Sequence, residues 1–424
     1  MEHDSIGALN VPAEAYYGVQ SMHAATNFQI THRLLHPVLI DSIVMVKKAA
    51  AITNEKSGKL DQQIAQAIIQ ACDEILDGNL RDQFIVDAIQ GGAGTSANMN
   101  ANEVIANRAI EILGGTKGDY SIVHPNDHVN MSQSTNDVIP TAGKITVLKL
   151  LPQTIKELEK LEKAMEEKEA EFDDILKMGR TQLQDAVPMR LGQSFGAFAH
   201  VLKRDIKRLK NVMDEMKVLN IGATAIGTAI NVDPYYLANI SYELSKVAGI
   251  SLKQADDLID ATQNLDGFVS VSGVLKTCAV DISKISNDLR LMSSGPRTGL
   301  SEINLPARQN GSSIMPGKIN PVIPEVVSQV AYLIIGHDYT ITMAAEAGQC
   351  EEYIEKSVGI STALCPYIGY AKSAEIAKKS LKTGISVKEL VLEEGLLKEE
   401  ELKEILKSEK MTQPMREKVM KAVS

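Results

Sequence analysis

The sequence predicts an all-α protein organised around a long central helix bundle, flanked by small N- and C-terminal domains. The first observation is compositional: of 424 residues 44% are hydrophobic, yet only 4% are aromatic and none is tryptophan. Such a core must be aliphatic, which suits helix-on-helix packing. The second is periodic: in several long stretches apolar residues recur every three or four positions with charged residues between them, as in amphipathic helices. A chain of this length is expected to form two or three domains.

The N-terminal domain is predicted to span residues 1–136. Its first part, residues 6–28, is broken by proline and glycine and is interpreted as a strand or loop. A helix is predicted from Pro37, with Lys47 on its outer face. A second helix is predicted over residues 62–76, followed by a glycine that ends it.

Two polar segments interrupt this domain. Residues 91–96, Gly-Gly-Ala-Gly-Thr-Ser, are interpreted as a glycine-rich turn that enters a helix through a Thr/Ser cap. The turn is either an ordinary helix start or a place where helical N–H groups face an anion. Residues 124–136 are polar almost throughout, which fits either a capping network or a binding surface. His124 and His128 can make structural hydrogen bonds or take part in catalysis, and the structural role is favoured.

The central domain, residues 137–349, is predicted to contain the bundle. One long amphipathic helix precedes the polar segment 179–188, and a second follows it. Their apolar stripes are formed by Leu148, Leu151, Ile155, Leu158, Leu161 and Met165, and by Leu191, Phe195, Phe198, Leu202, Ile206, Leu209, Met213 and Met216. Further helix is expected over residues 235–247, 256–291 and 322–345. A few long helices with short connections leave an apolar face without a partner, which predicts an oligomer.

The C-terminal domain, residues 350–424, has a different character. It is predicted to consist of shorter helices broken at Gly384 and Gly395. The charge-dense run 393–410 is interpreted as an amphipathic helix with a solvated face.

Composition excludes several classes of function. The net charge is −10 and there is no basic tract, which argues against nucleic acid as a partner. No apolar run approaches the ~18 residues of a membrane span, and no signal-peptide pattern is present. The cysteines show no CxxC spacing and no HxxxH pair lies on a predicted helix, so we expect free thiols and no metal site. The protein is therefore expected to be cytoplasmic, with no membrane or nucleic-acid partner.

The segment Gly311–Pro321, Gly-Ser-Ser-Ile-Met-Pro-Gly-Lys-Ile-Asn-Pro, contains two glycines and two prolines, which exclude a regular helix or central strand. It nevertheless carries two hydroxyls, an ammonium and an amide, a set that suits an active-site lid. Residues 91–96, 124–136 and 179–188 add further Thr, Ser, Asn and Gln side chains. Such donors fit a small dicarboxylate and stabilise negative charge that develops on it.

These segments resemble the signatures of the aspartase/fumarase superfamily. The motifs that carry the resemblance are GSSIMPGKINP at 311–321, Thr95 with Asn98-Met99-Asn100, Ser134-Thr135-Asn136-Asp137, and Gly179-Arg180-Thr181. They occur in the expected order, and the resemblance covers nearly the whole chain. Within the superfamily the sequence resembles the aspartate ammonia-lyases more than the fumarases, at residues 16–20, 82–84, 91–96 and 178–188.

The resemblance implies an all-α homotetramer whose central helices form one bundle and whose active sites each take loops from three subunits. It implies reversible anti elimination of ammonia from L-aspartate to give fumarate, through an aci-carboxylate intermediate and with no cofactor in the chemistry. The alternatives are a fumarate hydratase and a non-catalytic structural helical oligomer.

The resemblance also assigns roles to residues. Removal of the Cβ proton is assigned to Ser312. The residues assigned to the β-carboxylate are Thr95, Ser134, Thr135 and Ser313. Those assigned to the α-carboxylate are Thr181, Lys318 and Asn320. Asn136, with Ser134 and Thr95, would face the amino group, and Met315 would shape the pocket. A serine base needs loop N–H groups, a nearby ammonium and exclusion of water to become a nucleophilic alkoxide. Without the resemblance, Ser312 also fits a turn-capping serine.

Three features depart from the family pattern. Ser21-Met22-His23 stands where aspartate ammonia-lyases usually carry an arginine. Gln182 stands where fumarases carry a histidine, which argues against activation of water by a histidine at this position. It can instead hydrogen-bond the ammonium or a carboxylate of the substrate. After Gln349, about forty residues of the family pattern are absent, which would remove one bundle helix with its apolar stripe.

Overall fold

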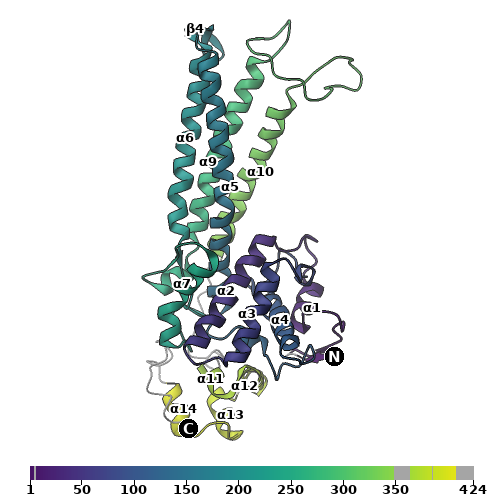
Figure 1. Cartoon of the computed structure of the whole chain (residues 1–424), viewed down its shortest axis with the longest axis vertical. Helices are drawn as coiled ribbons and strands as arrows, with labels where there is room; N and C mark the ends of the chain where they lie inside the picture. Colours follow the sequence, from purple (N-terminus) through teal and green to yellow (C-terminus); the bar gives the residue numbers. More distant parts are fainter. Residues whose placement is uncertain (4–5, 348–362, 384, 407–424) are drawn as a thin grey trace. The chain divides into compact units, whose positions relative to one another are not determined.

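The computed structural model describes residues 1–3, 6–347, 363–383 and 385–406 (Figure 1). The chain divides into two compact units. The first comprises residues 1–146, 217–264 and the described part of 348–424; the second comprises residues 147–216 and 265–347. Helices make up most of both units, which confirms the all-α prediction. The predicted domain boundaries at residues 136 and 349 stay a prediction.

The first predicted helices begin where the sequence supplies caps. α2 (Pro37–Lys56) follows His36, whose Nδ1 accepts a hydrogen bond from a backbone N–H of the first turn at 3.2 Å. α3 (Gln62–Leu76) follows Asp61, whose carboxylate accepts hydrogen bonds from two such N–H groups. These bonds satisfy donors that a helix N-terminus leaves unpaired. Both helices confirm the predictions.

The helix α1 (Val19–Asn27) contradicts the strand or loop predicted over residues 6–28. Before it, β1 (Glu2–His3) and β2 (Ala8–Leu9) pair as short antiparallel strands. The cause of α1 is Glu103, in α4 (Thr95–Ile112). This carboxylate accepts hydrogen bonds from three backbone N–H groups at the start of α1, at 2.9, 2.9 and 3.0 Å. The cap lies 82 to 85 residues away along the chain, so no local pattern reveals it.

One predicted helix is wrong in its extent. The helix expected over residues 256–291 is two helices, α8 (Leu258–Gln263) and α9 (Asp266–Met292). Asn264 between them has an extended backbone with φ −107° and ψ 133°, which ends α8. In contrast, α7 (Pro234–Ala248) confirms the helix expected over 235–247.

The C-terminal part of the first unit consists of short helices, as predicted. These are α11 (Cys365–Ile368), α12 (Tyr370–Thr383), α13 (Val387–Glu393) and α14 (Glu399–Ile405). They share a small apolar core that includes Leu364, Ile376, Leu390 and Leu402. Gly395, with φ 63°, follows α13. Gly384 and residues 407–410 of the expected charged helix lie outside the described residues.

The second unit contains the bundle. α5 (Thr135–Glu171) runs from the first unit into the second, where α6 (Leu191–Met216), α9 and α10 (Val322–Ala347) extend beside it (Figure 1). Most of the two predicted apolar stripes is buried, which confirms their assignment. Between α9 and α10, the buried Asp338 accepts hydrogen bonds from Ser272 Oγ at 2.8 Å and Lys276 Nζ at 2.6 Å.

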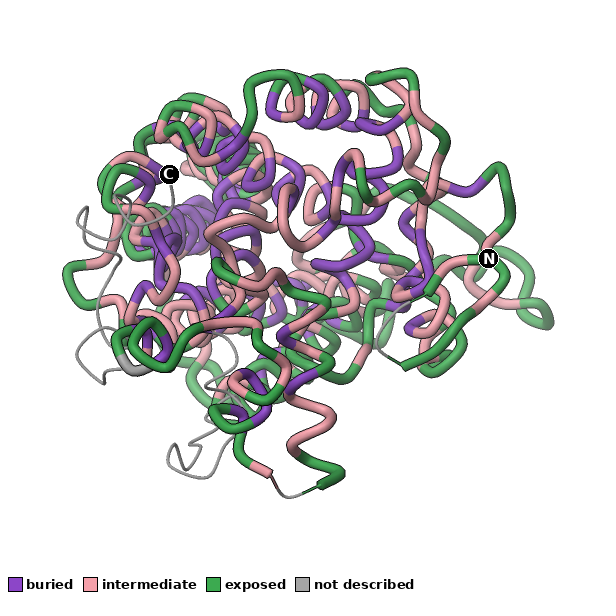
Figure 2. The backbone as a smooth tube through the Cα atoms, turned by 90° about the horizontal axis from the view of Figure 1, so that it is seen from below, coloured by how far each residue is buried: buried purple, intermediate pink, exposed green. Residues whose placement is uncertain are grey.

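One side of α10 remains exposed. Figure 2 shows buried and exposed positions alternating along the helices of the chain. On α10 the exposed positions include large apolar side chains: Ile323, Val326, Val330, Tyr332, Leu333 and Tyr339 are 47% to 70% exposed. This is the unpartnered apolar face that the sequence predicts. No helix in the described ranges combines the length and apolar character of a bilayer span.

Candidate active site

The glycine-rich turn at residues 91–96 belongs to the first unit and leads into α4. Gly94 is the N-cap of this helix, with φ 90°, and no side chain caps it. The predicted Thr/Ser cap is therefore wrong. A Cβ on Gly94 would lie 2.9 Å from Ile139 Cγ1, so both the backbone conformation and the space require glycine. Thr95 is exposed, and its hydroxyl donates a hydrogen bond to Gly92 O at 2.7 Å.

The start of the second polar segment forms a turn of π-helix, η2 (Pro125–Val129). His124 Nδ1 accepts hydrogen bonds from the backbone N–H of Asn126 and Asp127, at 3.2 and 3.1 Å. His128 Nδ1 accepts one from His124 N at 2.9 Å. Burial lowers the pKa of both imidazoles, although the nearby Asp127 carboxylate opposes the shift. Both histidines thus cap backbone groups as neutral rings, in agreement with the favoured structural role.

The end of this segment carries three predicted site residues into the first turn of α5. Thr135 Oγ1 accepts a hydrogen bond from Asn98 Nδ2 of α4 at 3.3 Å. Ser134 Oγ accepts one from Asn136 N at 3.3 Å, and the Asn136 amide donates to Ala225 O at 2.7 Å. The structure thus connects the loop of Ser134 and Thr135 to the helix that Thr95 begins.

A buried lysine supports this loop, and sequence reasoning missed it. Lys47, expected on the outer face of α2, is fully buried. Its ammonium donates hydrogen bonds to Asn130 Oδ1 at 2.7 Å and Gln133 Oε1 at 3.0 Å. Burial lowers its pKa to about 7, while the charge of Asp137 opposes the shift. Its spacing from Ile40 and Ile43, seven and four residues before it, could have revealed the buried face.

Asp137 holds the other side of the same loop. Its carboxylate accepts hydrogen bonds from the backbone N–H of Ser134 at 2.9 Å and of Gly222 and Thr224 at 3.1 Å. Burial raises the pKa of this group to about 7, although these bonds and Lys47 favour the charged form. Asp137 therefore fixes the backbone of Ser134 to the small-residue loop near residue 222.

In the second unit, residues 179–188 are not an irregular loop. They form most of an antiparallel hairpin of β3 (Leu176–Thr181) and β4 (Gln184–Arg190). The two-residue turn between them is Gln182-Leu183, with φ 49° and 65°. Such a turn usually contains glycine or asparagine, which is why the sequence did not reveal it. Thr181 and Gln182 are exposed at this end of the hairpin.

The lid segment closes on itself. Asn310 and Ile319 form a β-bridge, Gly311 N donates to Lys318 O at 2.8 Å, and the Asn320 amide donates to Gly311 O at 3.0 Å. Inside this loop Ser312 Oγ accepts hydrogen bonds from the backbone N–H of Ile314 at 3.2 Å and Met315 at 3.0 Å.

The remaining lid residues predicted for the site, Ser313, Met315 and Lys318, are exposed. The lid therefore presents these side chains around a serine whose oxygen already receives two N–H donors.

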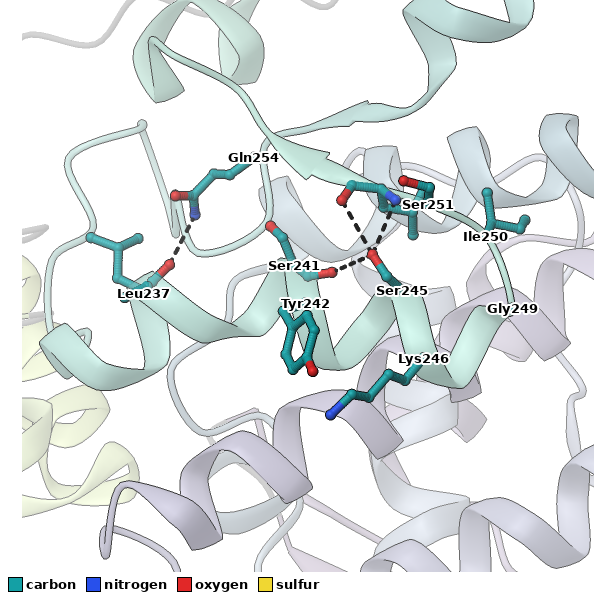
Figure 3. A pocket seen from close by; sticks show the side chains of 11 residues that line it. Leu237, Ser241, Tyr242, Ser245, Lys246, Gly249, Ile250, Ser251 and Gln254 are labelled. Atoms are coloured by element: carbon teal, nitrogen blue, oxygen red, sulfur yellow. Dashed lines mark hydrogen bonds between the residues drawn. The ribbon is translucent and has the colours of Figure 1, made fainter.

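A separate cavity of about 630 Å³ lies between α7 and β6 (Lys253–Gln254) in the first unit (Figure 3). None of the predicted site residues lines it. Ser245 Oγ donates to Ser241 O at 2.7 Å and accepts from Leu252 N at 3.0 Å, as the dashed lines show. These hydrogen bonds join α7 to the segment that follows it. Because no predicted site residue lines the cavity, it is not part of the candidate site.

Comparison with known proteins agrees with the resemblance in the motifs. The lyase family model matches residues 7–336, and that of the fumarase C C-terminus matches residues 360–413. An aspartate ammonia-lyase from Bacillus sp. is 49% identical over 456 positions, which cover 98% of this chain and 97% of that protein. An aspartate ammonia-lyase from Helicobacter pylori (strain ATCC 700392 / 26695) is 47% identical over 458 positions, with 98% of each chain covered.

Two solved structures have the same fold. A fumarate lyase:delta crystallin from Brucella melitensis, bound to cobalt, gives a TM-score of 0.80 at 47% identity, covering 96% of this chain and 97% of the other. A class II fumarase from Schistosoma mansoni gives a TM-score of 0.78 at 32% identity, covering 97% and 98%.

The alignment lengths bear on the segment expected to be absent after Gln349. The 456 aligned positions exceed the 424 residues of the chain, so at least 32 positions of that relative have no counterpart here. The two family models leave residues 337–359 unmatched, an interval that contains Gln349. The junction itself, residues 348–362, lies outside the described residues. Since a lyase model spans residues 7–336 and relatives nearly half identical align along almost the whole chain, this protein belongs to the lyase family, within the aspartase/fumarase superfamily.

Proposed function

We propose that this protein is an aspartate ammonia-lyase, a carbon–nitrogen lyase that converts L-aspartate reversibly to fumarate and ammonia. Relatives that bear this name are 46% to 49% identical to the chain over nearly its full length. All four polar segments on which the chemistry would depend are present. The reaction needs no cofactor in this proposal, because serine, threonine, amide and ammonium groups supply the base and the donors.

The observation that carries the proposal is the environment of Ser312. Its oxygen accepts hydrogen bonds from two backbone N–H groups, at 3.2 and 3.0 Å. Donors fixed in this way favour the alkoxide over the neutral hydroxyl. An alkoxide at Ser312 would take the Cβ proton of L-aspartate, and the electron pair would move onto the β-carboxylate as an aci-carboxylate. Collapse of this dianion would form the carbon–carbon double bond and release ammonia.

We assign the other residues according to the substrate group that each would contact as negative charge develops on the β-carboxylate. Thr95, Ser134, Thr135 and Ser313 would donate to the aci-carboxylate, and Thr181, Lys318 and Asn320 would hold the α-carboxylate. Asn136 would face the amino group, with Gln182 beside the ammonium or a carboxylate, and Met315 would shape the pocket. The Asn320 amide closes the lid loop through a hydrogen bond to Gly311 O, so it would exchange this acceptor for the α-carboxylate when substrate binds.

We propose that the active enzyme is a homotetramer with composite sites, each formed by loops of three subunits. The support is the row of large apolar side chains exposed on α10, since apolar surface of this kind marks a protein interface. The free thiols of Cys72 and Cys278 are buried, which fits the cytoplasmic location we propose.

The test is direct. Absorbance in the ultraviolet band of fumarate is expected to rise when the purified protein receives L-aspartate, and to stay flat with L-malate. The class II fumarase of similar fold makes fumarate hydration the second candidate. Turnover of L-malate without turnover of L-aspartate would reverse the assignment. A protein inactive on both would favour the structural oligomer.

A further inference from the structure

We propose that Glu302 is a positioning residue that holds Thr181 and Gln182 in place for the substrate, by tying their hairpin to the segment that leads into the lid. The effect on catalysis rests on the proposed function, but the contacts between Glu302 and the hairpin do not. Glu302 lies between α9 and Gly311, outside all four polar segments.

The hairpin has little else to hold it. Residues 184–188 of β4 are all exposed, and of β3 only Gly179 is buried. A Cβ on Gly179 would lie 2.8 Å from Val187 O, so the strands approach closely there. The turn itself is unfavourable, because Gln182 and Leu183 both have positive φ, which costs roughly 1 kcal/mol or more for each non-glycine residue.

Two basic side chains of the hairpin contact Glu302. Arg180 Nη1 donates to Glu302 Oε1 at 2.6 Å, and Lys177 Nζ lies 3.1 Å from Oε2. The Lys177 ammonium directs its hydrogen bond to Met292 Sδ at 3.6 Å, so we describe its contact with Glu302 as ionic. The three side chains are only 12% to 21% exposed. Ion pairs shielded in this way are screened less than surface pairs.

Glu302 is itself fixed to the bundle. Its backbone N–H donates to Met292 O, at the end of α9, at 2.8 Å. Burial by itself raises the pKa of the Glu302 carboxyl, but Arg180 and Lys177 hold the pKa below its ordinary value. A charged carboxylate on a fixed backbone thus holds Arg180, the residue directly before Thr181. Loss of the tie would free the end of the hairpin that carries Thr181 and Gln182.

The chain offers a matched control at the base of the same hairpin. Arg190 Nη1 and Asp173 Oδ2 form an ion pair at 3.2 Å, but both side chains are 49% exposed. A pair of this kind contributes little. Asp173→Asn therefore removes one acidic partner from the same hairpin without touching Glu302.

The first measurement is hydrogen–deuterium exchange of peptides within residues 176–190, because it requires no substrate. In Glu302→Gln we expect these amides to exchange at least about tenfold faster than in the wild-type protein, with α6 unchanged. In Asp173→Asn we expect exchange like that of the wild type. Unchanged exchange in Glu302→Gln would overturn the tie. If that variant does not fold, Arg180→Met gives the same reading with Glu302 still paired to Lys177.

The second measurement is steady-state kinetics with L-aspartate. In Glu302→Gln we expect kcat/KM to fall roughly ten- to a hundredfold, mainly through a higher KM, because Thr181 would hold the α-carboxylate less well. Glu302→Asp should recover part of this loss, and Asp173→Asn should stay within about twofold of the wild type. In an Arg180→Met background, Glu302→Gln should cost less than it does alone, since only the Lys177 contact is left to lose.

The outcomes separate the two proposals. Full kcat/KM in Glu302→Gln, or an equal loss in both backgrounds, would overturn the positioning role even if exchange increased. A wild-type protein that does not turn over L-aspartate would overturn the proposed function, while the exchange data would still decide whether Glu302 holds the hairpin.

Discussion

The backbone N–H of Met315 donates a hydrogen bond to Ser312 Oγ at 3.0 Å within a lid loop that is otherwise largely exposed. A serine that only caps a turn would show the same contact. A serine prepared as a base would show it as well, because the donor favours the alkoxide. The two roles differ in what the loss of the hydroxyl does to turnover.

The first prediction concerns Ser312. Ser312→Ala should lower kcat for L-aspartate by about 10²- to 10⁴-fold, since it removes the group that accepts the Cβ proton. The melting temperature should change little, because the loop is exposed. Fumarate binding, measured by calorimetry, should persist. Retention of turnover would mean that Ser312 caps a turn and that another group is the base.

The second prediction concerns Lys47. Lys47→Met should destabilise the protein by about 2–4 kcal/mol, because the buried oxygens of Asn130 and Gln133 lose a charged donor. Lys48→Met is the control: Lys48 pairs with Asp73 near the surface, and its loss should cost no more than about 1 kcal/mol. Equal effects in urea unfolding of the two variants would contradict a supporting role for Lys47.

Elements of this fold that depend on neighbouring residues can be predicted from the sequence. Elements that depend on residues far away in the sequence cannot. α3 was expected over residues 62–76 and has those bounds, because its cap and its apolar period lie within it. α1 was missed because its cap, Glu103, is distant in the sequence. The polar segments that carry Ser134 and Ser312 were recognisable by composition, but the hydrogen bonds that order them were not. Gln182-Leu183 carries no turn signal, so the hairpin became visible only in the structure.

The third prediction concerns pH. The Nδ1 atoms of His124 and His128 both accept backbone hydrogen bonds, and burial lowers both pKa values. Below their ordinary pKa of about 6.5 the unfolded chain therefore binds more protons than the folded one, so the folded state loses stability as pH falls. Thermal unfolding between pH 8 and pH 5 contains this loss together with the opposite contribution of Asp137, whose pKa is raised to about 7, so the histidine part is measured as the difference between the wild type and a variant.

The matched variant for this experiment replaces a titrating acceptor by a neutral one. In His128→Asn the side-chain oxygen can take the place of Nδ1 and does not titrate. The decline of melting temperature from pH 8 to pH 5 should be smaller in this variant. A steeper decline than in the wild type would show that neutral His128 is not what stabilises the loop.

The fourth prediction concerns the strained turn of the hairpin. Leu183 has φ 65° and is 69% exposed, so glycine there would relieve strain and lose little packing. Leu183→Gly should stabilise the hairpin by about 1 kcal/mol, seen as slower amide exchange within residues 176–190. Leu176→Gly, at a β3 position that is 76% exposed, should slow nothing. Faster exchange in Leu183→Gly would mean that the leucine side chain, not the backbone, sets the turn.

The fifth prediction concerns assembly. Leu333 is 58% exposed on the apolar face of α10, and a lysine there would place a charge in the interface we propose. Leu333→Lys should shift the protein to smaller species in light scattering and reduce turnover of L-aspartate in parallel, because composite sites need neighbouring subunits. Leu381→Lys, on α12 at 72% exposure, should leave mass and turnover unchanged. If the Leu333→Lys variant forms smaller species but keeps full turnover, each subunit completes its own site.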